Sequence, residues 1–198
     1  WLTGLISLKD NIELHIEKNA IVLASPDRNL FIKEIDGKKD TKCTPLISAS
    51  KRKNIAITGQ GVIDGNGAMW RPVKRDKVSN TEWKEFLYMG GTQTEGGKLW
   101  FPFDLKHYDN IAPTPEAQET MRTHLIRITD CENVLVKDIT LQNSPKFHLI
   151  PTRCKNVIVD GVTIRCPWNA QNGDALDISS CKDVLIVNNT IDAGDDGI

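Results

Sequence analysis

The sequence predicts an all-β fold in which short strands coil into a parallel β-helix. One phrase occurs three times, as Cys131-Glu132-Asn133-Val134, Cys154-Lys155-Asn156-Val157 and Cys181-Lys182-Asp183-Val184, at spacings of 23 and 27 residues. Repeats of this length are typical of solenoids, propellers and arrays. The repeats hold short β-branched runs of alternating pattern, such as Val134-Leu135-Val136, and no helical periodicity. This excludes the helical solenoids and favours three short strands per turn of the coil.

Weaker copies of the phrase extend the coil towards the N-terminus. They are Lys9-Asp10-Asn11-Ile12 and Lys53-Asn54-Ile55, and the second copy is followed by Gly61-Val62-Ile63. We expect the recurring cysteines and asparagines to form internal ladders. Asparagine suits the tight turns because it tolerates the left-handed backbone conformation.

The repeat is interrupted between about residues 66 and 122, which predicts an insertion of loops and helices. Thr81–Leu87 is expected to be a short helix with Trp83, Phe86 and Leu87 on one face, ended by Gly90-Gly91. A second short helix is expected to begin at Thr114-Pro115. Insertions in a solenoid form loops on one face, which is often the binding face.

Composition narrows the class of protein. The chain has 198 residues, 39% of them hydrophobic, and a net charge of −1, which argues against disorder and gives no support for nucleic-acid binding. No apolar run approaches the roughly 18 residues of a membrane span. The chain starts at Trp1, so it carries no information on a signal peptide. None of the five cysteines forms a C-x-x-C pair, so we expect mostly buried thiols and neither a metal site nor a cofactor.

Two carboxylate motifs carry the predicted chemistry. Asp174 and Asp196 are 22 residues apart, so one turn of the coil would place them side by side, with Asp195 next to them. Strands about 4.8 Å apart bring such carboxylates close enough to raise at least one pKa. Clustered carboxylates on a rigid wall suit acid/base hydrolysis of a glycosidic bond. The alternative is that they merely cap turns, and Asp177 could do so or order the site.

Several motifs together resemble glycoside hydrolase family 28, the polygalacturonases. The motifs are Asn143-Ser144-Pro145, Asn172-Gly173-Asp174, Asp177-Ile178-Ser179-Ser180, Gly194-Asp195-Asp196, Trp1-Leu2-Thr3-Gly4 and Gly61-Val62-Ile63-Asp64-Gly65-Asn66-Gly67. The insertion Trp70-Arg71-Pro72-Val73-Lys74-Arg75 is similar to that of bacterial members, particularly those of Bacteroides type.

The resemblance implies a right-handed, pectin-lyase-like parallel β-helix that hydrolyses α-1,4-galacturonosyl or related linkages with inversion, in a secreted or periplasmic protein. Asp195 would be the general acid, and Asp174 and Asp196 would hold and activate the attacking water. The usual Asn-Thr-Asp is here Asn172-Gly173-Asp174, and Gly197 replaces a frequent cysteine. The family's Gly-His-Gly and Arg-x-Lys motifs would follow residue 198. We therefore expect one incomplete β-helix domain that is inactive by itself.

Other side chains are candidates for binding a pectic polysaccharide or oligogalacturonide. The first are His148, Arg153, Asn172 and Asp177, and further cations are Lys146, Arg71, Lys74 and Arg75. Trp70, Trp100 and Trp168 are candidates to stack on sugars or close one end of a cleft, although packing in the core or a loop is the default interpretation for Trp168. His15, His107 and His124 are expected at the surface or in loops.

Two other functions stay open at this point. Calcium-dependent β-elimination of pectate uses an acidic cluster and an arginine base on the same type of coil. A non-catalytic β-helix could simply bind polysaccharide. The long insertion weakly favours exo over endo action, and the oligomeric state is not indicated.

Overall fold

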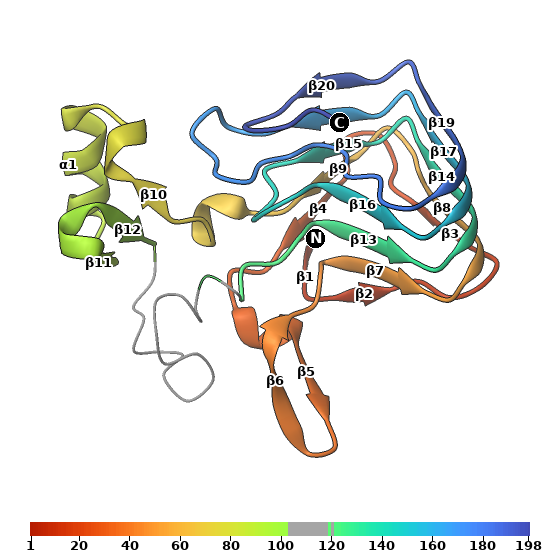
Figure 1. The fold of residues 1–198 in the computed structure, drawn as a ribbon, viewed down its shortest axis with the longest axis horizontal. Coiled ribbons are helices and arrows are strands. Elements are labelled where there is room, and N and C mark those ends of the chain that lie inside the picture. The colour runs from red at the N-terminus through yellow and green to blue at the C-terminus, as the bar shows by residue number, and fades with distance from the viewer. Residues whose placement is uncertain (103–118, 120) are drawn as a thin grey trace.

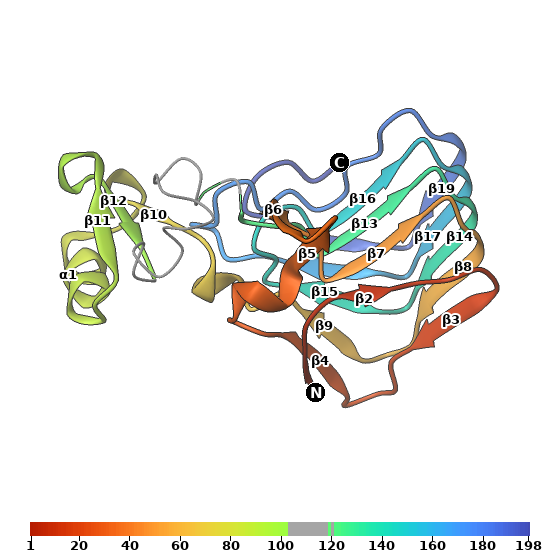
Figure 2. The same ribbon diagram turned by 90° about the horizontal axis from the view of Figure 1, so that it is seen from below.

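Three parallel sheets form the body of the molecule (Figures 1 and 2). The computed structural model describes residues 1–102, 119 and 121–198. Sheet A contains β1 (Leu2–Thr3), β4 (Ile21–Ala24), β9 (Val62–Asp64), β15 (Thr140–Gln142), β18 (Thr163–Arg165) and β20 (Thr190–Asp192). Sheet B contains β2 (Ile6–Ser7), β7 (Ile47–Ser50), β13 (Ile126–Thr129) and β16 (Leu149–Thr152). Sheet C contains β3 (Ile12–His15), β8 (Lys53–Thr58), β14 (Glu132–Lys137), β17 (Lys155–Asp160) and β19 (Lys182–Val187).

Each turn of the coil takes one strand from sheet B, one from sheet C and one from sheet A. Ile126 of β13 pairs with Ile47 in the turn below and with Leu149 in the turn above. A parallel bridge from Leu149 to Leu176 carries sheet B into the next turn. The connections have the right-handed sense that parallel crossovers favour, so the predicted right-handed parallel β-helix is confirmed.

The interior of the coil is filled by stacked β-branched side chains. In β14, Val134 and Val136 are buried, and they pair in register with Ile55 and Ile57 below and with Val157 and Val159 above. The alternation of inward and outward side chains in each strand therefore produces continuous apolar columns.

The cysteines form the expected internal ladder at the corner between sheets B and C. Cys131 and Cys154 are buried, and all five thiols are free. The backbone N–H of Cys154 donates to Sγ of Cys181 at 3.3 Å. The thiols of Cys131 and Cys181 thus accept backbone hydrogen bonds from the neighbouring turns.

The asparagines form a ladder as well, but on the outside. Asn11, Asn54, Asn133 and Asn156 all have φ between 55° and 58°. The amides of the last three each donate to the oxygen of the asparagine in the turn below, at 2.7, 2.7 and 2.9 Å. All four are exposed. The expected internal position was wrong, because the left-handed turn residue points its side chain to solvent, whereas the cysteine two positions before Asn133 or Asn156 points inward.

The long insertions leave the coil at the corner between sheets A and B. One of them, residues 25–46, carries η1 (Arg28–Phe31) and a hairpin of β5 (Ile32–Ile35) and β6 (Lys38–Cys43), which the sequence did not predict. The shorter connections 143–148 and 166–175 leave the coil at the same corner. Segment 193–198, which follows β20, also lies there. Loops from successive turns therefore gather along one edge of sheet B.

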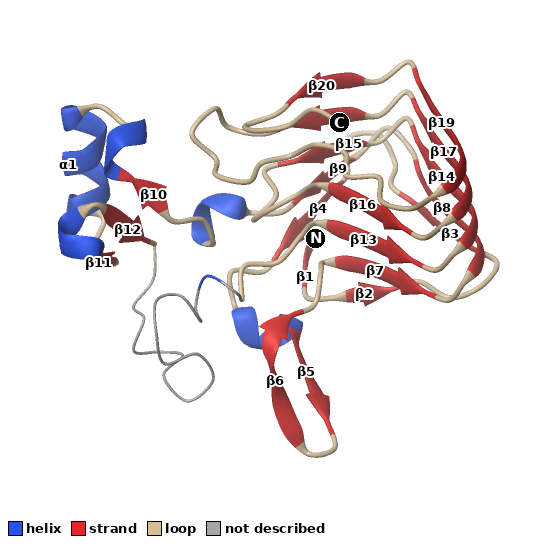
Figure 3. Ribbon diagram, viewed as in Figure 1, coloured by secondary structure: helices blue, strands red, loops and turns tan. Residues whose placement is uncertain are grey.

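The second insertion, residues 65–125, is the predicted one (Figure 3). It contains η2 (Gly67–Met69), β10 (Val73–Lys74), η3 (Arg75–Lys77), α1 (Asn80–Tyr88), β11 (Thr92–Thr94), η4 (Glu95–Gly97) and β12 (Leu99–Phe101). A capping box between Ser79 and Glu82 starts α1, and Gly90 and Gly91 follow it with positive φ. The predicted first helix is thus confirmed, whereas the expected second helix lies outside the described residues. No helix among the described residues is long and apolar enough to cross a membrane.

Candidate active site

Asp174 and Asp196 lie side by side at the edge of sheet B. The backbone N–H of Ala175 donates to the carbonyl oxygen of Asp196 at 2.9 Å, and that of Gly194 to Gly173 at 3.3 Å. In a parallel ladder the first of these bonds places residue 174 opposite residue 196. The two segments are therefore neighbours, as the 22-residue spacing predicts, although the second bond departs from a regular ladder. The chain bends at Gly194 and Asp195, and both Asp195 and Asp196 are exposed.

Two carboxyl groups of this cluster have raised pKa values. Burial raises the pKa of Asp174, and the nearby charges of Asp195 and Asp196 add to the effect. Burial likewise raises the pKa of Asp177, with contributions from Asp174 and Asp196. The expected rise in at least one carboxyl pKa is found. Oδ1 of Asp174 and Oδ2 of Asp177 are buried without a hydrogen-bond partner among the described residues, so each still has an oxygen available as an acceptor.

His148 lies beneath Asp174 and has no exposed surface. The backbone N–H of Ser144 donates to its Nε2 at 3.3 Å, so Nδ1 carries the proton and donates to the carbonyl oxygen of Asp174 at 2.9 Å. The backbone N–H of His148 donates to the same oxygen at 2.9 Å. Burial lowers the pKa of His148 to about 4. The structure thus places this residue behind the aspartate as a neutral support, not in contact with substrate as predicted.

Arg122 is a buried cation that the sequence did not single out. Its guanidinium donates to the carbonyl oxygens of Pro145 and Gln171 at 3.1 and 2.7 Å and to Oδ1 of Asn172 at 2.9 Å, and it pairs with Glu119. It therefore joins the connections 143–148 and 166–175 just before Asp174. Arg122 is not part of a repeat or a motif, and the carbonyl and amide oxygens that it binds belong to other turns. The sequence around it therefore gives no sign of its role.

The loop that carries Asp174 is packed too tightly for a side chain at Gly173. A Cβ there would lie 2.8 Å from Sγ of Cys166, and one at Gly194 would lie 2.8 Å from the carbonyl oxygen of Pro167. This explains physically why glycine stands where the family pattern has threonine. Gly197 has space, since the nearest atom to its Cβ would be 3.8 Å away.

The remaining predicted binding residues are spread over the molecule. Asn172 lies at the cluster, where Oδ1 binds Arg122. Asp177 faces outward from sheet B, in register with Ile150 and, one turn further, with Arg127. Arg153 is not at the site. It lies at the far end of β16 and binds Asp130 through two hydrogen bonds of 2.7 and 2.8 Å.

Most of the other expected cations and aromatics serve the packing of the chain. Arg71 is buried and donates to Ser144 and Asn143, and Arg75 donates to Val78 and lies over Trp83. Trp70 and Trp100 are 1% and 4% exposed, whereas Trp168 is 67% exposed. Of the three candidates for stacking on a sugar, Trp70 and Trp100 are therefore buried, and Trp168 is exposed in connection 166–175.

Two of the three remaining histidines lie within the described residues. His15 is half-exposed, as expected for a surface residue. His124 packs against Phe147 with ring centroids 5.0 Å apart, and burial lowers its pKa to about 3. It lies in the loop before β13, in agreement with the expected surface or loop position, and His107 lies outside the described residues.

A cavity of about 230 Å³ opens beside Asp195. It is lined by Lys74, Lys77, Trp168, Asn169, Ala170, Gln171, Asn172, Gly194 and Asp195. The insertion supplies the two lysines, and connection 166–175 supplies the tryptophan and the amides. Of the cations predicted from the insertion, Lys74 alone lines this cavity, and Lys77 was not predicted.

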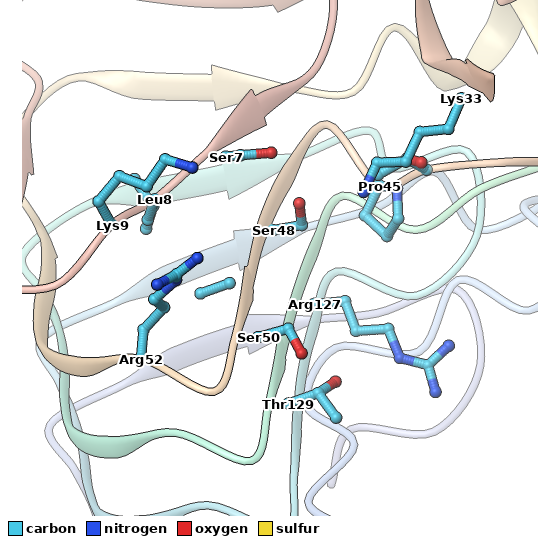
Figure 4. A pocket seen from close by; sticks show the side chains of 12 residues that line it. Ser7, Leu8, Lys9, Lys33, Pro45, Ser48, Ser50, Arg52, Arg127 and Thr129 are labelled. Atoms are coloured by element: carbon cyan, nitrogen blue, oxygen red, sulfur yellow. The ribbon is translucent and has the colours of Figure 1, made fainter. Parts of the chain in front are cut away.

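A larger cavity, of about 520 Å³, lies on the outer face of sheet B in the N-terminal turns (Figure 4). Lys9, Lys33, Arg52 and Arg127 line it together with hydroxyl groups, and no carboxylate does. None of the predicted site residues is part of it. Arg127 belongs to the same outward column as Asp177, two turns away, so this basic surface lies on the face that carries the aspartates.

Comparison with known proteins agrees with the fold and the motifs. The sequence model of the glycosyl hydrolases family 28 matches residues 102–198. A probable polygalacturonase of Vitis vinifera is 27% identical over 99% of this chain and 34% of its own length. An exo-poly-alpha-D-galacturonosidase of Dickeya chrysanthemi is 24% identical over the same shares. The chain thus spans about a third of these relatives.

Solved structures show the same architecture. The polygalacturonase from Erwinia carotovora ssp. carotovora superimposes with a TM-score of 0.68, at 24% identity, over 100% of this chain and 46% of that one. The family 28 exopolygalacturonase of Yersinia enterocolitica gives a TM-score of 0.69 at 21% identity, over 100% and 37%. Residues 102–198 therefore match the model of glycosyl hydrolase family 28, and nearly the whole chain is similar in sequence to polygalacturonases.

Proposed function

We propose that this chain forms the catalytic wall of a glycoside hydrolase that cleaves the α-1,4 linkages of galacturonan or pectin by inverting acid/base hydrolysis. The observation that carries the proposal is that Asp174 and Asp196 lie side by side in adjacent turns. Asp195 lies at a bend next to this pair and lines an open cavity. The polygalacturonase names of the relatives support the same chemistry.

In the proposed reaction each carboxylate has one task. Asp195 gives its proton to the glycosidic oxygen as the bond from that oxygen to the anomeric carbon breaks. Asp174 and Asp196 hold a water molecule and accept its proton while the water oxygen attacks the anomeric carbon from the opposite face. A raised pKa makes Asp174 a stronger base for this step.

The other residues take supporting tasks in this proposal. His148 holds the backbone of Asp174, and Asn172 is placed by Arg122 at the rim of the cavity, where it can contact substrate. Asp177 lies beside the pair and keeps its charge close to the bound water. Arg153 has no part in the site, since its guanidinium is engaged by Asp130.

The proposal extends to the setting of the enzyme. A pectic polymer lies outside the cell that digests it, which favours a secreted or periplasmic protein. The long insertions at the corner beside the aspartates favour attack at a chain end over attack within the chain. We also propose that the single β-helix domain continues into further turns that complete the site.

The test is Asp195→Asn in the full-length protein, assayed by release of reducing sugar from polygalacturonate. We expect the rate to fall by about 100-fold or more, because a general acid contributes that much. The matched control is Asp183→Asn, at an exposed turn position that is asparagine in the turns below. Unchanged release in Asp195→Asn would rule out the proposed acid.

The same assay separates the alternatives. Products that absorb in the ultraviolet, with activity lost on removal of calcium, would indicate β-elimination in place of hydrolysis. Binding of polygalacturonate without any product from the unmodified protein would indicate a non-catalytic β-helix.

A further inference from the structure

We propose that Lys74, Lys77 and Trp168 form a subsite for one uronate unit of the substrate, on the side of the scissile bond that adjoins Asp195. The lysines would bind the sugar carboxylate and the indole would cover the sugar face. This inference rests on the proposed function, in which the insertion would supply the two lysines that bind the substrate.

The charge inside the cavity favours an anionic ligand. Lys74 and Lys77 are both exposed, and neither makes an ion pair or a side-chain hydrogen bond within the described part of the chain. Among the described residues that line the cavity, Asp195 carries the only carboxylate. Two cations therefore face one anion, and a bound carboxylate would restore the balance of charge.

Trp168 gives the cavity an apolar wall. Its side chain is 67% exposed, which is unusual for the largest apolar residue on a soluble protein. Sugar-sized pockets commonly combine such an aromatic face with a few polar groups that fix orientation. Here the polar groups are the two lysines and the amides of Asn169, Gln171 and Asn172.

Both walls of the cavity are built as ordered structure. Lys74 belongs to β10, which pairs with β12, and the backbone N–H of Arg75 donates to Lys98 at 2.8 Å. Connection 166–175 is held by Arg122 at Gln171 and by the bond from Ala170 to Pro167 at 2.9 Å. The lysines and the indole are therefore presented at fixed places beside Asp195.

The expected consequence is selection for an unesterified acid at this position. A methyl ester has no charge for the lysines to bind, and an exposed ion pair contributes roughly 1 kcal/mol, which is about fivefold in affinity. We therefore expect each lysine to lower KM for an oligogalacturonate by about fivefold, and to leave KM for the fully methyl-esterified oligomer unchanged.

The experiment measures kcat and KM of the full-length protein on an oligogalacturonate and on its methyl ester of equal length. Lys74→Ala and Lys77→Ala should each raise KM for the acid alone, with kcat little changed. Trp168→Ala should raise KM for both oligomers. Lys84→Ala is the matched control, because Lys84 is an exposed lysine of the same insertion outside the cavity.

Some outcomes would overturn the subsite while the proposed function stands. One is that the double lysine variant keeps its KM for the acid. Another is that its KM rises equally for acid and ester. If the unmodified protein releases no sugar, the proposed function fails, and calorimetric binding of the same oligogalacturonate then tests the subsite by itself. Unchanged affinity in the double variant would overturn it, and a loss of about 25-fold would support it.

Discussion

Below the aspartates, His148 makes the stability of the site depend on pH. Burial lowers its pKa to about 4 in the folded protein, whereas a histidine in an unfolded chain titrates near 6.5. Between these values the unfolded chain binds a proton that the folded protein does not. The free energy of unfolding therefore falls as pH drops from 6.5 towards 4, by up to about 3 kcal/mol for this side chain. His124, whose pKa is lowered to about 3, acts in the same direction.

We expect His148→Gln to be less stable than the original at pH 7, because Gln cannot make both ring contacts in the same geometry. Its loss of stability between pH 7 and pH 5 should be smaller, by about 2 kcal/mol. Urea unfolding at the two pH values measures both quantities. An equal loss in the two proteins would contradict the buried neutral histidine.

Single residues also show what the sequence could and could not predict. The pairing of Asp174 with Asp196 follows from a spacing, because the coil repeats regularly in this region. Whether a tryptophan is exposed depends on which segments of the insertions pack over it. The local sequence around the tryptophan does not indicate this. Trp70 is covered by Phe31 and Arg28, which come from the unpredicted first insertion. Arg153 was predicted to bind substrate, but it follows β16 at the end away from the aspartates and is engaged by Asp130.

Among the elements, the connections at the corner between sheets A and B determine the shape of the site. Connection 143–148 is held by Arg71 from one side and by Arg122 from the other. Arg122 also holds connection 166–175, which carries Asn172 and leads into Asp174. The guanidinium therefore fixes the two connections relative to each other. A lysine has a single ammonium group and could not bind the same carbonyl and amide oxygens simultaneously.

Arg122→Lys should lower the free energy of unfolding by about 3 kcal/mol, because it removes a buried, multiply bonded partner of Glu119. Under the proposed function it should also lower kcat more than it raises KM, since it displaces the loop that carries the base. Denaturant unfolding and steady-state kinetics measure the two effects. The control is Arg127→Lys, because Arg127 is an exposed arginine in the same turn. Equal effects in the two variants would contradict the role of Arg122 in holding the two connections together.

At the scale of the whole molecule, the three-sheet coil could be predicted because its core consists of local repeats. The inward columns of valine and isoleucine and the turn asparagines recur from one turn of the coil to the next. The hairpin of residues 25–46 and the small sheet of β10, β11 and β12 could not be predicted. Their strands are two to six residues long and they pack against one another or against the coil, so no periodicity marks them.

Neighbouring turns are separated by very different lengths of chain. β14 and β17 are 23 residues apart in sequence, whereas β8 and β14 are 79 apart. We expect amides of β14, β17 and β19 to gain protection before those of β3 and β8 when the protein refolds, because short closures form sooner. Pulse-labelled hydrogen exchange measures this order. Earlier protection of the N-terminal strands would contradict it.

The placement of the long insertions at one corner has an evolutionary consequence. Closing 79 residues instead of 23 costs only about 1 kcal/mol more in chain entropy, since the cost grows with the logarithm of length. Descendants of this gene can therefore lengthen, shorten or replace the segments around the aspartates at little thermodynamic cost. The coil keeps its register through such changes, so the segments around the aspartates can diverge while the aspartates themselves stay in place.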